Sequence, residues 1–367
     1  MASLELKNIV KRYKSHTVLD DLSLTVADGE TLVLFGPSGA GKTVLLRLVA
    51  GVIDPDEGKI LIGGEDMTDV DAEFRGVGMA FQNFALFPHM SAYDNIASGL
   101  TARVIDPATI RPRVEAVASM LKISHVLAHQ PRELSNGQKQ RTALARALIA
   151  NPRTLLLDDP LRNVDAKLRY EMRLELPGLL RRSGSAVLYV TQDYREAMAL
   201  GDRIAVMVDG RIVQLDAPES VYDSPASVQI ARLFGDPTIN LLSVQPVLQG
   251  GMLYATVANT SLPLGQGYES CAGRRCTLGL RPEALVVTEQ DAPGAIPVQV
   301  MAVTPLHERV VLLLRTPEGH EILASATEPP LNGRQSGHAF LRFDPDSVLL
   351  FDEASGARLH RGEGVRA

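Results

Sequence analysis

Cysteines, long apolar runs and basic clusters are scarce in this 367-residue chain, and each absence excludes a class of protein. The two cysteines, Cys271 and Cys276, have neither a second pair nor a histidine cluster near them, which excludes a zinc set and predicts ordinary thiols in a reducing compartment. No apolar run reaches the ~18 residues that a membrane-spanning helix needs. Residues 1–10 lack the charged-then-apolar layout of a signal peptide. We therefore expect a soluble, cytosolic protein that reaches a membrane only through a partner.

Acidic residues outnumber basic ones, 43 against 37. The formal net charge is −6, and the sequence has no Lys/Arg-rich block. Both features argue against a polyanion, so we expect no nucleic acid among the partners.

The pattern of the chain predicts two domains. Hydrophobic residues make up 45% of the sequence, which is enough for a sizeable core. Up to about residue 200, apolar strands alternate with helical segments, which predicts a parallel sheet wrapped by helices. Beyond about residue 240, short strands and Gly/Pro turns predict a separate all-β domain of oligomer-barrel type, with a joint near Gly235. Its expected strands are Thr277–Leu280, Leu285–Thr288, Val298–Val303, Val310–Leu314 and Ala339–Phe343.

The most specific motif is a phosphate-binding loop made of Gly36, Pro37, Ser38, Gly39, Ala40, Gly41, Lys42 and Thr43. An apolar run precedes it and a helix-compatible run follows it, which is the context that such a loop requires. The glycines let the backbone curl so that several N–H groups point at one anion. Lys42 can bridge the outer phosphates, and the Thr43 hydroxyl can ligate Mg²⁺ at the start of a helix. The alternative is a plain Gly-rich turn without a ligand. The flanking strand and helix favour the phosphate-binding loop over this alternative.

Four other polar side chains follow apolar strands of the same predicted sheet. Gln82 follows one strand, Asp158 and Asp159 end a second, and Gln192 follows a third. Because the carboxyl ends of parallel strands meet at one edge of a sheet, we expect these side chains to lie beside the phosphate loop. An apolar strand that runs into acids can place a carboxylate beside Mg²⁺ without burying it unpaired. In isolation, Gln82 has a plainer interpretation as a cap at the end of a strand.

Further segments are candidate nucleotide contacts. Ser135 and Gly137 lie in Leu134–Gln138, just before a predicted helix, where backbone N–H groups would form a second anion site. An ordinary serine N-cap is the alternative. Tyr13 stands upstream of the phosphate loop, where its ring could stack on adenine, although a lone tyrosine is more often a packing residue. The helical periodicity of residues 91–130 predicts a helical lobe inserted between two halves of the α/β core.

In this order and spacing, the motifs resemble those of the ATP-binding subunits of ABC transporters, over the whole chain. Further motifs resemble the carbohydrate importer branch, of the maltose, trehalose and glycerol-3-phosphate type: Phe81-Gln82 with Phe87-Pro88-His89, Leu168-Arg169, Thr238-Ile239-Asn240 and Leu280-Arg281-Pro282-Glu283. The resemblance implies an α/β P-loop NTPase fold with an ABC ATP-binding domain over residues 1–235, which includes a helical subdomain at about 84–150. An all-β, OB-like regulatory domain over residues 236–367 would follow.

The resemblance also implies the ligands and the roles of individual residues. ATP and Mg²⁺ would bind at the loop, and two subunits would dimerise head to tail, so that each ATP lies between the loop of one subunit and the signature segment of the other. The implied nucleotide contacts are the loop together with Tyr13, Ser135, Gly137, Gln138 and Asp165. The implied ligands of Mg²⁺ are Thr43, Gln82 and Asp158. The implied catalytic residues are Lys42, Gln82, Asp159 and Gln192.

The partners that the resemblance implies are those of an importer. Two transmembrane permease subunits would dock over residues 82–95, where Phe84 and Phe87 could form an apolar groove. A second ATP-binding subunit, either a copy of this chain or a paralogue, would complete the dimer at the cytoplasmic face of the plasma membrane. An extracytoplasmic binding protein would supply the solute, which could be a sugar, polyol, sulfosugar or glycerol phosphate. A regulatory protein would bind the C-terminal domain.

Three positions depart from the pattern of the family. Asp159 stands where a glutamate is usual as general base, Gln192 replaces a histidine, and Asn136 replaces a glycine. Two interpretations stay open: a working but slow ATPase that uses Asp159, or the degenerate half of an unequal pair. A regulator that uses ATP only for dimerisation is the alternative outside transport. An ABC protein of DNA repair or translation would need a coiled-coil insertion or a second cassette, and neither is present.

Overall fold

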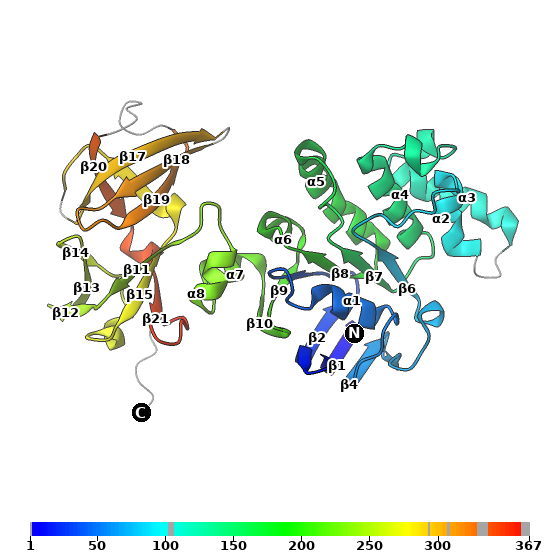
Figure 1. Ribbon diagram of the computed structural model, residues 1–367, viewed down its shortest axis with the longest axis horizontal. Coiled ribbons are helices and arrows are strands. Elements are labelled where there is room, and N and C mark those ends of the chain that lie inside the picture. The colour runs from blue at the N-terminus through cyan, green and yellow to red at the C-terminus, as the bar shows by residue number, and fades with distance from the viewer. Residues whose placement is uncertain (1, 102–105, 293, 307–308, 329–336, 361–367) are drawn as a thin grey trace. The chain divides into compact units, whose positions relative to one another are not determined.

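The computed structural model describes residues 2–101, 106–292, 294–306, 309–328 and 337–360 of the chain. The chain forms two units, residues 1–221 and 222–367 (Figure 1). A boundary of the ATP-binding domain at residue 235 stays a prediction. In the described residues, no helix has both the length and the apolar character that crossing a membrane requires.

An antiparallel sheet opens the first unit, with strand order β2-β1-β4-β5. The strands are β1 (Ala2–Tyr13), β2 (His16–Ala27), β4 (Glu57–Ile62) and β5 (Glu65–Asp66). Side chains of β2 alternate between buried and exposed because one face of this sheet covers the core and the other meets water.

The second sheet of this unit positions the site, and its strand order is β10-β9-β3-β8-β7-β6. Its strands are β3 (Thr31–Phe35), β6 (Val77–Ala80), β7 (Thr154–Asp158), β8 (Ala186–Thr191), β9 (Arg203–Val208) and β10 (Arg211–Asp216). All neighbouring pairs are parallel except β9 with β10. Every residue of β3, β7 and β8 is buried, as expected for parallel strands that are covered on both faces.

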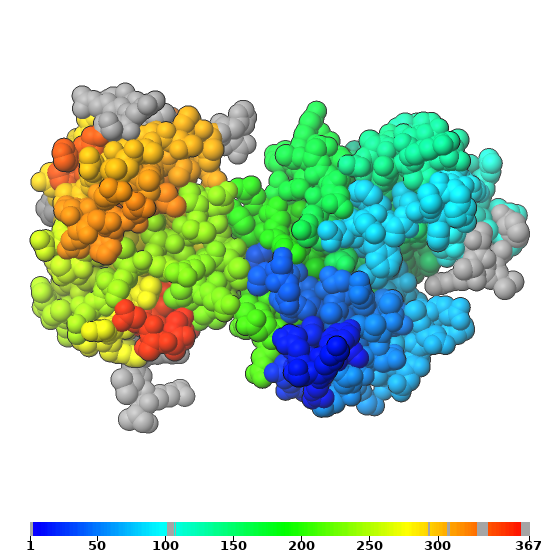
Figure 2. Space-filling model, in the orientation of Figure 1, coloured from blue at the N-terminus to red at the C-terminus, as the bar shows by residue number. Residues whose placement is uncertain are grey.

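Helices cover the parallel sheet and extend beyond it. Helix α1 (Lys42–Val49) shares a core with both sheets, as the fully buried Leu6 of β1, Leu32 of β3 and Leu45 show. Helices α5 (Ala166–Ser183) and α6 (Tyr194–Leu200) follow β7 and β8. Figure 2 shows the N-terminal strands, in blue, and the later segments of this unit, in green, side by side on the surface.

The predicted helical lobe is present but less regular than its sequence suggested. It contains α2 (Ala92–Thr101), α3 (Pro107–Met120) and α4 (Asn136–Leu148). Between α3 and α4, two single 3₁₀ turns replace continuous helix, Ser124–Val126 and Pro131–Glu133. Proline starts the second of these turns, where a missing N–H group costs nothing.

The second unit is a β-rich domain, as predicted. Two short helices, α7 (Pro218–Asp223) and α8 (Val228–Leu233), lead into it. One sheet has the order β11-β15-β21, with β11 (Asn240–Val244), β15 (Cys276–Leu280) and β21 (Leu349–Asp352). A second sheet has the order β12-β13-β14, with β12 (Val247–Gln249), β13 (Met252–Val257) and β14 (Thr260–Pro263).

The largest sheet of this unit has the order β16-β20-β17-β18-β19. It contains β16 (Leu285–Thr288), β17 (Ile296–Leu306), β18 (Arg309–Arg315), β19 (Glu321–Ala326) and β20 (Gly337–Phe343). The three sheets share one apolar core. Cys271 and Cys276 are buried in that core as free thiols.

Candidate nucleotide-binding site

The predicted site residues emerge from four strands that are neighbours in the parallel sheet, β3, β8, β7 and β6. The phosphate loop follows β3, Asp158 ends β7, and Gln192 follows β8 directly. Gln82 follows β6 after one intervening residue. The carboxyl edge of the sheet therefore gathers these side chains, as the alternation of strands and helices predicted.

Two glycines of the phosphate loop are required by close backbone approaches. A Cβ atom on Gly36 would lie 2.1 Å from the carbonyl oxygen of Met207 in β9, well inside van der Waals contact. Gly41 has a φ of +104°, and a Cβ atom there would lie 2.9 Å from the carbonyl oxygen of Val18. The loop can pass this close to its neighbours only because both residues lack side chains.

Helix α1 presents an open N-terminus to the cavity. Gly41 is its N-cap, so no side chain caps the helix, and its first turn contains no acidic residue. By contrast, Ser135 caps α4 and Asp165 caps α5. Backbone N–H groups at an uncapped helix N-terminus attract anions, so α1 is suited to bind phosphate.

Lys42 supplies a buried positive charge at the same place. The residue is only 5% exposed. Its Nζ atom donates to the carbonyl oxygens of Gly36 at 2.7 Å and Pro37 at 2.6 Å. Burial lowers the pKa of Lys42, while the nearby carboxylates of Asp159 and Asp158 oppose that shift. A terminal phosphate would give this ammonium group the anionic partner that the loop carbonyls do not provide.

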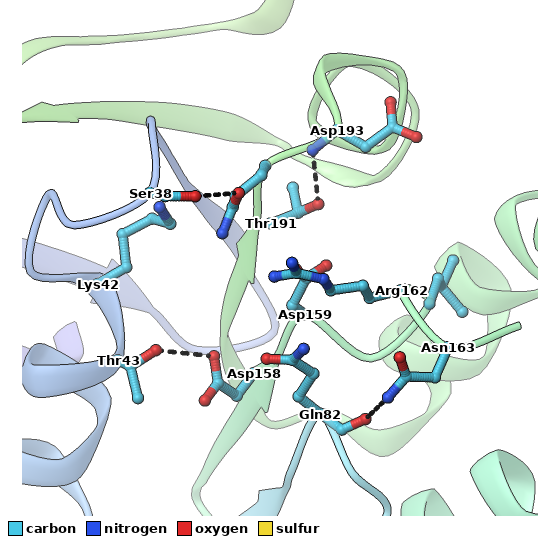
Figure 3. Close-up of polar contacts among 12 residues, drawn as sticks. Ser38, Lys42, Thr43, Gln82, Asp158, Asp159, Arg162, Asn163, Thr191 and Asp193 are labelled. Carbon is cyan, nitrogen blue, oxygen red and sulfur yellow. Dashed lines mark hydrogen bonds and ion pairs between the residues drawn. The ribbon is translucent and has the colours of Figure 1, made fainter.

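The oxygen atoms beside Lys42 fit a magnesium ion. The Thr43 hydroxyl donates to a carboxylate oxygen of Asp158 at 3.4 Å, and the Gln82 side chain lines the same cavity (Figure 3). Burial raises the pKa of Asp158, and the Thr43 hydrogen bond acts against the rise. In the described part of the chain, no three His, Cys, Asp or Glu side chains form a metal cage. One carboxylate with hydroxyl and amide oxygens suits Mg²⁺, which keeps several waters and binds phosphate oxygens.

Asp159 is held in an unusual backbone conformation. Its φ is +44°, a left-handed value that residues other than glycine seldom adopt, and its N–H group donates to the carbonyl of Val190 at 2.9 Å. The residue is 7% exposed, and burial raises the pKa of its carboxyl. Arg162 opposes this shift, with its Nη1 atom 3.6 Å from a carboxylate oxygen of Asp159.

Gln192 connects the end of β8 to the phosphate loop. Its side-chain oxygen accepts a hydrogen bond from the Ser38 hydroxyl at 2.8 Å. Behind it, Glu196 is 1% exposed and accepts from the hydroxyls of Tyr189 at 2.8 Å and Thr191 at 2.9 Å. Burial raises the pKa of Glu196 to about 7. A buried polar network therefore supports the backbone that carries Gln192.

Many of these groups line one cavity of about 380 Å³. Figure 3 shows in close-up the polar contacts among several of them. Of the residues predicted for the site, it gathers Ser38, Gly39, Gly41, Lys42, Thr43, Gln82, Asp158, Asp159 and Gln192. The lining also includes Val18, Val44, Arg162 and Val190, which the sequence did not single out. Arg162 is the important omission, and its only sequence signal is a cation placed shortly after the acid pair.

Other predicted contacts lie outside this cavity lining. Tyr13 is 47% exposed, with Nζ of Lys11 5.6 Å from its ring centroid. Ser135 accepts a hydrogen bond from the N–H group of Gln138 at 3.3 Å, and its own N–H group donates to the Gln138 side chain at 2.9 Å. Asp165 accepts from the N–H group of Leu168 at 3.0 Å. Within one chain, Ser135 and Asp165 cap helices. The predicted contacts of all these residues with nucleotide stay predictions.

Gly137 is a packing residue of the signature segment. It is buried, and a Cβ atom on it would lie 2.2 Å from the side chain of Leu168 in α5. Gly36, Pro37 and Ala40 complete the phosphate loop without lining the cavity.

The fold and the cavity together define an ATP-binding domain of the P-loop class. Residues 19–162 match the ABC transporter family, and residues 278–351 match the TOBE domain. Over 298 residues, the chain is 45% identical to the sn-glycerol-3-phosphate import ATP-binding protein UgpC of Shigella boydii serotype 4 (strain Sb227) and 44% identical to that of Escherichia coli (strain K12). Each match covers 81% of this chain and 83% of the relative.

A solved structure supports the same assignment. The dimeric, post-hydrolysis ATP-binding cassette MJ0796, bound to ADP and Pi, is 30% identical, with a TM-score of 0.53, over 59% of this chain and 98% of that chain. The chain belongs to the ATP-binding proteins of ABC transporters. It is an ABC-type ATPase subunit of an importer, as its motifs predicted, and its second unit is the OB-like domain expected after the ATPase.

Proposed function

We propose that this chain drives the import of a glycerol phosphate by binding and hydrolysing ATP. The observation that carries the choice of solute is the 45% identity to an sn-glycerol-3-phosphate import protein, which covers 83% of that relative. The site itself supports the ATPase and has no bearing on the solute, because the ATPase subunit of an importer does not contact it.

The cavity suggests a division of roles in ATP hydrolysis. The N–H groups of α1 and the Lys42 ammonium would hold the outer phosphates, and Thr43, Asp158 and Gln82 would hold Mg²⁺. The ion, when bound, neutralises charge that develops on the phosphates. Asp159 accepts a proton from the attacking water as the water oxygen bonds to the terminal phosphorus and the bond to the ADP oxygen breaks.

Gln192 and Ser38 orient this attack. Their hydrogen bond joins the end of β8 to the loop that grips the phosphates. A glutamine side chain can donate its amide hydrogens to a phosphate oxygen while its oxygen accepts from the serine. Gln192 can therefore take the position of a γ-phosphate contact without carrying charge.

A head-to-tail dimer would complete the site. Ser135, Gly137 and Gln138 lie on a different element from the phosphate loop and outside its cavity lining. A second ATP-binding subunit could bring these residues against the nucleotide that the phosphate loop of the first subunit holds. Closure on ATP and opening after hydrolysis would then move two permease subunits.

The permeases would dock over residues 82–95, at the cytoplasmic face of the membrane. This segment has a fixed shape: the guanidinium of Arg146 donates to the carbonyls of Ala85 at 2.7 Å and Phe84 at 3.1 Å. Both carbonyls belong to residues with positive φ, at +47° and +63°. Asn95 is fully buried, and its side chain accepts from the N–H group of Phe87 at 2.8 Å and donates to the carbonyl of Phe87 at 3.1 Å. Phe87 itself is 43% exposed, so a partner could contact it.

Transport in a reconstituted system tests this function. The chain is co-expressed with two permease subunits, and the complex is placed in proteoliposomes with a solute-binding protein. We expect ATPase activity to rise when the binding protein carries sn-glycerol 3-phosphate and not when glycerol replaces it, and Lys42→Ala to abolish the rise. Stimulation by an unphosphorylated sugar alone would contradict the proposed solute. Failure to associate with any permease would favour the alternative of a non-transport regulator.

A further inference from the structure

The β-rich unit contains a pocket of its own. Its volume is about 680 Å³, within the range of ~300–1,000 Å³ that small-molecule sites occupy. The walls come from the end of α7, the 3₁₀ turns Pro282–Ala284 and Pro345–Ser347, the start of β21 and residues 358–360. Every lining residue belongs to the second unit, and none of them lines the ATP cavity. The pocket is therefore a separate candidate site.

Arg281 brings a buried positive charge to the lining of this pocket. The residue is only 6% exposed. Its Nη2 atom donates to the carbonyl of Tyr222 at 2.6 Å, and its Nη1 atom donates to the carbonyls of Ala231 at 3.3 Å and Phe234. The guanidinium carbon also lies 3.9 Å from the centroid of the Tyr222 ring. These contacts fix the guanidinium, but carbonyls and a ring carry no full negative charge to neutralise it.

Arg358 adds a second guanidinium to the same lining. The residue is half-buried, and its N–H group donates to the carbonyl of Ala226 at 2.9 Å. Burial lowers the pKa of Arg281, and the charge of Arg358 adds to this shift. The two positive charges therefore lie close enough to repel each other. An anion bound between them would relieve this repulsion, and the planar fork of a guanidinium suits carboxylate and phosphate oxygens.

The carboxylates of the pocket occupy the more exposed part of its lining. They belong to Asp223, Glu283 and Asp346. Glu283 accepts a hydrogen bond from the Tyr222 hydroxyl. Together with Tyr222, Glu283 and Asp223 oppose the lowering of the Arg281 pKa. Water screens charges at exposed positions, so these acids weaken the positive charge of the arginines without removing it. Carboxylate oxygens also accept hydrogen bonds from the hydroxyl groups of a ligand.

We propose that this pocket binds a small hydroxylated organic anion, of the class of sugar phosphates and sugar acids. Arg281 and Arg358 hold the phosphate or carboxylate group, and the exposed carboxylates accept hydrogen bonds from the hydroxyl groups. Inorganic phosphate alone would fill only a small part of a pocket of this size. A neutral sugar would leave the two guanidinium charges uncompensated. The proposal goes beyond the import activity and does not depend on the imported solute.

Isothermal titration calorimetry on the full chain tests this site. Saturating Mg-ADP keeps the phosphate loop occupied, so that the added anions cannot bind there. The probes are glucose 6-phosphate and gluconate, which present a phosphate and a carboxylate on a hydroxylated carbon chain. Glucose and inorganic phosphate are the controls, because each carries only half of this chemistry. We expect at least one probe to bind with one-to-one stoichiometry, and about tenfold or more tightly than either control.

The titrations also decide which anionic group the pocket prefers. Binding of glucose 6-phosphate alone would assign the arginines to a phosphate, and binding of gluconate alone would assign them to a carboxylate. If neither probe binds, the proposal is wrong. Equal affinity for inorganic phosphate would overturn it too, since the hydroxyl groups would then contribute nothing.

Arg358→Gln locates the binding in this pocket. We expect it to weaken binding of the probe about tenfold or more, because it removes a charged donor to the anion. Arg281 is a poorer choice for this test, since its loss would leave three backbone carbonyls without their donor. Arg342→Gln is the matched control, because it removes an exposed arginine of β20 outside the pocket lining. Wild-type affinity in both variants would place the ligand elsewhere and refute the assignment.

Asp346→Asn tests the exposed carboxylates and guards against a folding defect in Arg358→Gln. Asp346 is exposed, so its replacement should leave the unfolding temperature close to wild type. The change removes an acceptor for hydroxyl groups and a negative charge that repels anions. The affinity for the bound probe relative to inorganic phosphate should therefore fall about threefold or more. An unchanged ratio would contradict the proposed role of the carboxylates.

Discussion

Replacing Glu196 by glutamine should remove a pH dependence from the stability of the first unit. Burial raises the pKa of Glu196 to about 7 from its ordinary value of 4.5. Between these values, the folded chain holds a proton on Glu196 that the unfolded chain releases, so stability falls as pH rises. The fall is about 1.4 kcal/mol per pH unit and roughly 3 kcal/mol across the window. The stabilisation that the protonated Glu196 contributes is fully present below pH 4.5 and is lost by about pH 7.

Glutamine stays neutral throughout this window and keeps an oxygen that can accept from the hydroxyls of Tyr189 and Thr191. Glu196→Gln should therefore match wild type near pH 5 and exceed it near pH 8, by up to roughly 3 kcal/mol. Other groups that titrate in the same range contribute equally to both proteins, so they cancel in the difference between the two free energies of unfolding.

Urea unfolding at pH 5 and pH 8 measures this difference. The chain has no tryptophan, so a single tryptophan at Tyr93, a half-buried position in the helical lobe, can report on the first unit. Glu171→Gln, which changes an exposed glutamate of α5, is the control and should show no such pH dependence. Equal differences between Glu196→Gln and wild type at both pH values would refute a buried, protonated Glu196.

Three other changes test the phosphate loop, the docking segment and the metal site. Gly36→Ala places a Cβ atom 2.1 Å from the Met207 carbonyl and should weaken ATP binding about tenfold or more, since a strain of ~1.4 kcal/mol suffices for that. Gly178→Ala in α5 is the control, because a Cβ atom there has no neighbour closer than 3.7 Å, and it should stabilise the fold by about 0.5–1 kcal/mol. Equal ATP affinity in the two variants would contradict the steric argument. Arg146→Gln frees the carbonyls of the docking segment and should reduce ATPase stimulation by the permease complex, and undiminished stimulation would remove Arg146 from coupling. Thr43→Ala should raise the Mg²⁺ concentration for half-maximal ATPase roughly tenfold, and an unchanged requirement would exclude the hydroxyl as a ligand.

The sequence predicted the parts of the site that depend on strand ends. Residues 154–157 and 186–190 read as buried strands, and their ends carry Asp158 and Gln192 to the same edge as the phosphate loop. This worked because the parallel topology follows from alternating strands and helices, and the topology alone determines which residues become neighbours.

Other features required three-dimensional contacts. The sequence marks Arg162 only as a cation shortly after the acid pair, because its place in the cavity depends on a distance to Asp159 across a turn. The role of Gly36 is set by Met207, which lies far away in the chain. In the second unit, the short strands Val247–Gln249 and Thr260–Pro263 were missed, since edge strands this brief carry too few alternating residues to be seen.

The turnover of the purified chain tests the central claim most directly. Steady-state ATP hydrolysis is measured for the wild-type chain alone and for Asp159→Asn, at saturating Mg-ATP and neutral pH. If Asp159 is a working base, the wild type hydrolyses ATP by itself and Asp159→Asn loses roughly 100-fold or more in kcat. A wild-type chain that binds ATP without hydrolysing it, and gains turnover only beside a paralogous subunit, would show instead that this site is the inactive half of an unequal pair.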